Sequence, residues 1–152
     1  MWLRVASVVL ALFLAGCDPF YGVESRATLT GPVDVDCVNA ALTNLPEAST
    51  VTYQRDESRS TQIFPKQRKV LTVMHVWLYG EGSNDILQIN QTPDGWDYSN
   101  SRTRMGVAVP HAEMARFEPL MVKVNRAIQS RCGLPVGDLK AEPVGETRTQ
   151  EL

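Results

Sequence analysis

The stretch VLTVMHVWLY at residues 70–79 restricts the fold more than any other part of the chain. It is rich in β-branched, aromatic and other apolar residues and contains neither glycine nor proline, which is typical of a β-strand. Because alternate residues of a strand point to opposite faces, apolar side chains would lie on both sides of it. The stretch therefore predicts a central strand of a sheet that is covered on at least one side. One face would carry Leu71, Val73, His75, Trp77 and Tyr79.

The residues that follow predict an antiparallel meander. The turn-forming segment GEGSND at 80–85 separates this strand from a second one at 86–91. The segment TPDG at 92–95 predicts another turn, after which 96–104 would form the last strand. With two shorter candidates earlier in the chain, the sheet would contain about four or five strands. Those earlier candidates are 23–30 and 50–54.

Two helices are expected to cover one face of this sheet. Asp34 is a suitable N-cap for a first helix with a one-sided apolar pattern, which Pro46 would end. The second helix would run from Pro110 to Gly133, with apolar residues three and four positions apart. Pro119 lies inside it, which predicts a kink near Phe117 or two abutting helices. The expected fold class is α+β, an antiparallel sheet with both helices packed on one face.

The first residues have the layout of a secretory signal. Arg4 supplies a positive amino end, and the uncharged run at 5–16 ends in two small residues. As a helix that run would span about 18 Å, whereas a bilayer core is about 30 Å thick. The segment is therefore too short to cross a membrane.

Residues 14–17, LAGC, resemble the lipobox of bacterial lipoproteins. In that family the cysteine receives a diacylglycerol on its sulfur, a peptidase cuts before it, and the new amine is acylated. The resemblance implies that Cys17 is lipidated and holds the chain on a membrane, because two or more acyl chains anchor stably. The alternative is an ordinary signal peptide cut nearby, with Cys17 a free thiol. Asp18 resembles the inner-membrane retention signal of enteric lipoproteins, and inner or outer membrane stays open.

The remainder is expected to form a single domain. After a signal peptide at 1–16 and a tether at 17–22, the domain would span 23–135, followed by a flexible tail at 136–152. The formal net charge of −2 and export both argue against nucleic acid as a partner.

The stretch at 55–69 is polar and contains five basic residues. It could contact anionic lipid heads near the anchor. The alternative is a solvated loop or a long hairpin. The basic residues are Arg55, Arg59, Lys66, Arg68 and Lys69.

Cys37 and Cys132 are expected to form a disulfide. Once Cys17 is set aside, an exported chain with two cysteines favours a single intramolecular bond. The bond would join the first helix to the last turn of the second. No Cys-x-x-Cys motif suggests redox chemistry, and His75 and His111 lack the spacing to either cysteine that a zinc site needs.

Motifs of catalysis are missing from the sequence, and no cofactor is expected. There is no Gly-x-Ser-x-Gly, no glycine-rich phosphate loop and no His-Glu-x-x-His. His75 fits a packed histidine better than a general base, and His111 fits the start of a helix.

The aromatic residues are the candidate binding site. Trp77 and Tyr79 share one face of their strand, and Trp96 and Tyr98 share one face of a later strand. If these faces point away from the helices, they would form an exposed aromatic patch with His75, typical of a binding surface. If they point toward the helices, the same residues are core.

These observations predict a non-catalytic binding module, lipid-anchored in the bacterial envelope and facing the periplasm. It would bind or inhibit another envelope protein. The alternative is a receptor for a small ligand, lipid or glycan that uses the aromatic face. An enzyme is not expected.

Overall fold

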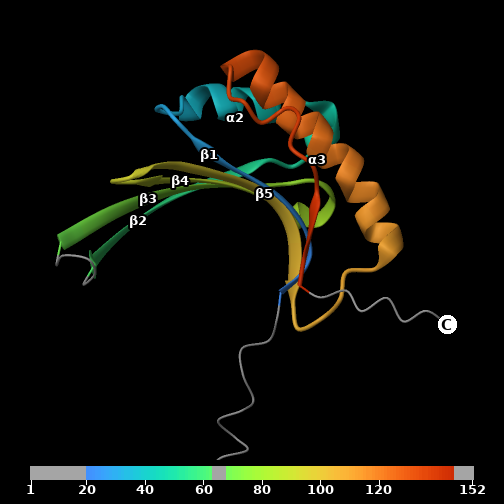
Figure 1. Ribbon diagram of the computed structural model, residues 1–152. Coiled ribbons are helices and arrows are strands. Elements are labelled where there is room, and N and C mark those ends of the chain that lie inside the picture. Colours follow the sequence, from blue (N-terminus) through green and yellow to red (C-terminus); the bar gives the residue numbers. More distant parts are fainter. Residues whose placement is uncertain (1–19, 63–67, 146–152) are drawn as a thin grey trace, which may run out of the picture.

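The computed structural model describes residues 20–62 and 68–145 as a curved sheet with helices on one side (Figure 1). The predicted signal peptide, Cys17 and Lys66 lie outside the described residues. Within the described ranges, no helix has the length and apolar character needed to cross a bilayer.

The sheet has six strands in the order β2-β3-β4-β5-β1-β6, and each neighbouring pair is antiparallel. The predicted central strand, β3, lies between β2 and β4, and the meander β3-β4-β5 forms as expected. β1 lies beside β5 and therefore joins distant parts of the chain. The strands are β1 Phe20–Leu29, β2 Thr52–Gln62, β3 Arg68–Tyr79, β4 Asp85–Thr92, β5 Gly95–Met105 and β6 Glu142–Val144.

Helices α2 (Val35–Thr43) and α3 (His111–Cys132) pack on one face of the sheet, which confirms the predicted α+β fold (Figure 1). Asp34 caps α2 by accepting a hydrogen bond from the Cys37 amide at 3.0 Å. Gly133 ends α3 with a left-handed φ of 70°. α3 is one helix despite Pro119. Two short 3₁₀ turns, η1 (Pro46–Ala48) and η2 (Glu81–Ser83), lie in the connections.

The predicted disulfide between Cys37 and Cys132 is confirmed. It joins the first turn of α2 to the last turn of α3, with the two Cα atoms 5.8 Å apart. The bond therefore connects the two helices on their side of the sheet.

The hydrophobic core lies between the helices and one face of the sheet. That face supplies side chains that are fully buried, among them Trp77, Leu87 and Ile89. The helices complete the core with Val38 of α2 and Met121 of α3, both fully buried. We call this face of the sheet the helix face.

A buried polar network crosses the core at Asn125 of α3. Its Oδ1 accepts hydrogen bonds from Tyr98 Oη at 2.5 Å and from Asn100 Nδ2 at 2.9 Å. Its Nδ2 donates to Ser25 Oγ at 3.1 Å, and Asn100 Oδ1 accepts from Tyr79 Oη at 2.5 Å. Burial raises the pKa of both tyrosines, so their hydroxyls stay protonated as donors. The network joins α3 to β1, β3 and β5.

The polar stretch after residue 54 forms most of a long hairpin, which was one of the alternatives for it. β2 continues to Gln62 and pairs with β3 along its whole length. Residues 68–72 of β3 pair only with β2, since the pairing with β4 begins at Val73. This hairpin end projects away from the helices (Figure 1). Charged side chains suit an exposed edge strand, which does not need the alternating pattern that sequence reasoning looks for.

The segment after residue 135 was expected to be a flexible tail, but it is packed as far as residue 145. Val136 is fully buried, and β6 pairs with β1 opposite Gly22 to Glu24. A three-residue strand with Pro143 at its centre carries no strand signal of its own. Proline is tolerated there because β6 is an edge strand.

Candidate functional site

Three of the five predicted binding residues are in the core. Trp77 and Tyr79 of β3 are 0% exposed and Tyr98 of β5 is 1% exposed. They point toward the helices, so the exposed aromatic patch on the opposite face does not form. Trp77 also donates from Nε1 to Asn39 Oδ1 of α2 at 3.2 Å.

His75 is buried on the same face, beside Tyr53 of β2. Its Nδ1 lies 2.8 Å from Tyr53 Oη, and its ring stacks near the rings of Trp77 and Trp96, at 6.3 Å between centroids in each case. Burial, followed by the charge of Arg55, lowers the pKa of His75. The imidazole is therefore neutral at pH 7 and serves as a packed, hydrogen-bonded ring.

Tyr53 lies beside these aromatic rings, and the sequence pattern did not indicate it as a site residue. Its ring lies 5.1 Å from Trp77 and remains 39% exposed, whereas Trp96 is partly buried. The row of Tyr53, His75, Trp77 and Trp96 thus offers only its edge to solvent. It packs the margin of the core and does not form a concave site.

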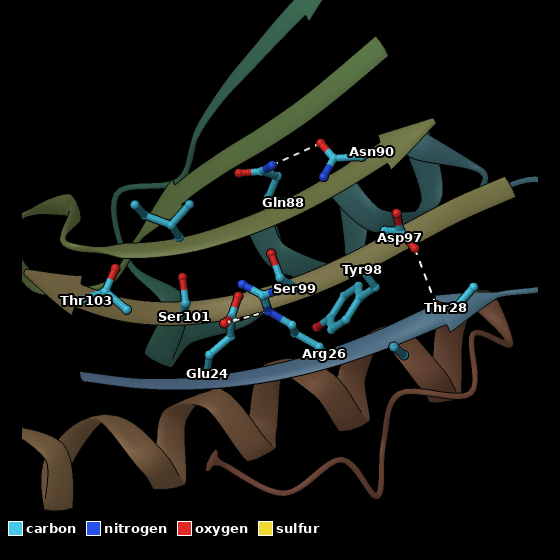
Figure 2. A pocket seen from close by; sticks show the side chains of 12 residues that line it. Glu24, Arg26, Thr28, Gln88, Asn90, Asp97, Tyr98, Ser99, Ser101 and Thr103 are labelled. Atoms are coloured by element: carbon cyan, nitrogen blue, oxygen red, sulfur yellow. Dashed lines mark hydrogen bonds and ion pairs between the residues drawn. The ribbon is translucent and has the colours of Figure 1, made fainter. Parts of the chain in front are cut away.

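Neither of the described helices, α2 and α3, lies over the opposite side of the sheet, which we call the open face (Figure 1). A cavity of about 620 Å³ lies on this face across β4, β5 and β1 (Figure 2). Its floor is built from side chains that alternate with the core residues of the same strands. They include Gln88, Asn90, Ser99, Ser101 and Thr103.

Polar contacts order this floor. Gln88 Nε2 donates to Asn90 Oδ1 at 2.9 Å along β4, and Thr28 Oγ1 donates to Asp97 Oδ1 at 3.4 Å (Figure 2). Arg26 Nε lies 2.6 Å from Glu24 Oε2, and this contact raises the pKa of Arg26. The Arg26 side chain is nevertheless 77% exposed, so its charge remains available at the rim.

An apolar stripe borders the polar floor on the open face. In register, Leu78 stands opposite Ile86, and Val76 stands opposite Gln88, which in turn stands opposite Ser99. The apolar side chains of this stripe are all partly exposed, and neither α2 nor α3 packs on them. They are Met74, Val76, Leu78 and Ile86.

A charged cluster lies at the end of the sheet where β4 begins. Asp85 is 1% exposed, and its Oδ1 accepts from Arg102 Nη1 at 2.8 Å. Arg102 Nε lies 2.7 Å from Glu113 Oε1 of α3, and Arg104 also pairs with Glu113 at 2.7 Å. Asp85 Oδ2 has no hydrogen-bond partner among the residues that the structure describes, and it packs against Gly80, where a Cβ would lie 2.1 Å away. The cluster ties α3 to β4 and β5.

Burial raises the pKa of Asp85 to about 6, which outweighs the attraction of Arg102. A carboxyl group with a raised pKa binds more protons when folded than when unfolded, so its contribution to stability falls as pH rises from about 4 to about 6. The wild type should lose roughly 3 kcal/mol of its free energy of unfolding over this range through Asp85, and Asp85→Asn should abolish that loss. Urea unfolding at pH 4 and at pH 7 gives the free energy of unfolding of both proteins. The difference between variant and wild type should change by that amount between the two pH values. The exposed Asp138→Asn is the matched control. An Asp85→Asn effect that is equal at both pH values would contradict the expectation.

Among the described residues, no group of three His, Cys, Asp or Glu side chains could hold a metal ion. His75 and Asp85 belong to separate clusters, on the aromatic row and at the charged end of the sheet. The polar floor was not found from the sequence. The signal that could have indicated it is the alternation of leucine and isoleucine with glutamine and asparagine in β4.

Comparison of the chain with protein-family models, with curated proteins and with solved structures finds no match.

Proposed function

We propose that the protein is a non-catalytic binding module, lipid-anchored in the bacterial envelope, that binds or inhibits another envelope protein through its open face. The observation that carries the proposal is the apolar stripe of β3 and β4, which is partly exposed on a sheet face that neither described helix covers. Contiguous exposed apolar side chains bordered by polar ones are typical of protein-binding surfaces.

The open face combines the parts that a protein interface needs. At its centre, four residues stand side by side on four neighbouring strands: Val76 of β3, Gln88 of β4, Ser99 of β5 and Arg26 of β1. Along this row the side chains change from apolar to uncharged polar to cationic. The exposed Arg26 and the amides of the floor can donate to a partner's carbonyl or carboxylate oxygens. The apolar stripe supplies the surface that becomes dry on association.

A receptor for a small ligand, lipid or glycan is the second candidate. The aromatic platform on which it was based is largely buried, since Trp77, Tyr79 and Tyr98 face the helices. A ligand would instead meet the hydroxyl and amide groups of the cavity. The polar floor favours such a ligand, and the apolar stripe beside it favours a protein.

Lipid anchoring is proposed from the LAGC motif, whose Cys17 lies outside the described residues. Lipid anchoring is supported by the start of β1 at Phe20, which is three residues after Cys17. No long linker separates the anchoring cysteine from the folded domain.

Variants at the centre of the open face test the proposal. Val76→Glu and Gln88→Arg place charge in the interface without touching the core, and each should weaken partner binding roughly tenfold or more. The wild-type protein and each variant would be immobilised with the disulfide intact and offered native envelope extract, and bound proteins would be identified by mass. Glu118→Arg, on the exposed side of α3, is the matched control.

One protein retained at stoichiometric level by the wild type and the control, but lost from both open-face variants, would establish the module and its surface. A protein captured equally by all four chains would place the interface elsewhere. Capture of wall glycan or lipid in place of any protein would favour the second candidate.

A further inference from the structure

Exposed apolar side chains gather at one end of the sheet. The largest exposures are those of Met105 at 62%, Val107 at 61% and Phe20 at 55%. Phe20 begins β1, Met105 ends β5, and Val107 lies in the loop that follows. We call these three residues the base.

The base is held in place by the fold. Phe20 and Met105 are direct partners in the antiparallel pairing of β1 and β5, so their side chains lie on the same face of the sheet. Gly106 turns the chain after Met105 with a left-handed φ of 71°. Val109 is buried at 6% exposure and fastens the loop, which leaves Val107 outside. The three apolar groups are therefore presented together.

The covalent distance to the anchor decides what covers the base. Three chain steps join Cys17 to Phe20, which allows at most about 10 Å between them. A lipidated Cys17 lies at the membrane surface, so Phe20 lies within that distance of it and brings its strand partner Met105 close to the same surface. The start of β1 and the end of β5 meet at the lower end of the molecule in Figure 1, with the β2–β3 hairpin projecting elsewhere.

Leu71, another exposed apolar residue, does not share this position. Leu71, at 44% exposure, lies in the hairpin end that only β2 and β3 form. The register places that end of β3 at the end of the sheet opposite to Phe20, because β1 starts where β4 starts and β3 ends. The basic hairpin is thus carried away from the anchor, and the apolar base faces it.

We propose that Phe20, Met105 and Val107 insert into the headgroup region of the membrane that holds the lipidated Cys17, so that the domain stands on the bilayer in one orientation. The proposal rests on the lipid anchor of the proposed function. Insertion of a few apolar side chains beside acyl chains adds to membrane affinity and restricts rotation of the domain. The open face would then stand at the side of the domain, free to meet a partner in the periplasm.

A tryptophan introduced at the base measures its depth in the membrane. Val107→Trp would be introduced into the full chain, lipidated in a bacterial host and reconstituted into vesicles of phosphatidylethanolamine and phosphatidylglycerol that contain brominated lipid. Leu71→Trp is the matched control at the far end of the sheet. After subtraction of the wild-type emission, brominated lipid should quench the added fluorescence of Val107→Trp roughly fivefold more than that of Leu71→Trp.

A second change tests whether the apolar side chains cause the insertion. Phe20→Ser combined with Met105→Ser in the Val107→Trp chain should reduce quenching several-fold while flotation with vesicles is unchanged. Circular dichroism checks that this chain remains folded. Sedimentation of the detergent-solubilised wild type should show a monomer.

The outcomes separate the proposals. A chain that floats but shows equal quenching in Val107→Trp and Leu71→Trp overturns the insertion of the base and leaves the anchor intact. A dimer that the serine substitutions dissociate shows that a second copy covers the base, and this also overturns the insertion. A wild-type chain that does not float contradicts the anchor, and the insertion is then rejected with it.

Discussion

Replacing Asn125 with leucine is expected to lower the free energy of unfolding by about 3–5 kcal/mol. Leucine has nearly the same shape but neither donor nor acceptor, so three buried groups lose their partner at once. Tyr98 Oη and Asn100 Nδ2 lose their acceptor, and Ser25 Oγ loses its donor. A buried group without a partner costs more than the hydrogen bond contributes when it is formed. Denaturant unfolding followed by circular dichroism measures the change.

Asn39→Leu is the matched control for this prediction. Asn39 is partly exposed on α2, and its side chain accepts one hydrogen bond, from Trp77 Nε1. The same chemical change there should cost about 1–2 kcal/mol, because only one buried group, the Trp77 indole N–H, loses its partner. If Asn125→Leu costs no more than Asn39→Leu, the network does not stabilise the fold in the way proposed.

Removal of the disulfide is expected to cost about 2–5 kcal/mol. Cys37 and Cys132 are 95 residues apart in sequence, so the bond restricts most of the unfolded chain. The folded state should change little, since α2 and α3 also pack on each other and Arg131 donates to the Ala40 carbonyl at 3.3 Å. The measurement is the unfolding free energy of the double variant Cys37→Ser/Cys132→Ser against that of the oxidised wild type.

Reduced wild-type protein is the control, because it is the same chain without the crosslink. It should lose the same stability as the double serine variant. A folded, unreduced protein that is readily alkylated at Cys37 or Cys132 would show instead that the bond is not formed in solution.

The sequence predicted the fold class because its strongest signals are local. The β-branched and aromatic run of β3, the turns on either side of β4 and the cap at Asp34 each depend on a few adjacent residues. The disulfide followed from counting, since two cysteines remain once Cys17 is set aside, and these have one way to pair within the chain.

The candidate site was harder to predict because the faces of β3 look alike in sequence. Trp77 on one side and Val76 on the other are both apolar, and only the register with β4 shows which side is core. Trp77 stands opposite the buried Leu87, whereas Val76 stands opposite Gln88. Register depends on long-range pairing, which a single sequence does not specify.

β6 and the length of β2, whose predicted strand ended at residue 54, were missed for related reasons. β6 is stabilised by the free edge of β1 and not by its own composition. The polar residues of β2 belong to an exposed edge strand, which can carry polar side chains on both of its faces. In both cases the neighbouring strand determines the structure.

The pairing of β1 with β5 and β6 has a consequence for the order in which the domain can form. Residues 20–29 cannot pair with β5 until residues 95–105 are present. Cys37 cannot form its disulfide until Cys132 is present. Contacts between such distant segments form late, because a long loop must close before they do. If the chain crosses a membrane as an extended thread, as the proposed lipid anchor requires, β1 and Cys37 therefore stay without their partners until most of the chain has crossed. The topology that closes the finished domain would then delay the folding of these first segments until late in translocation.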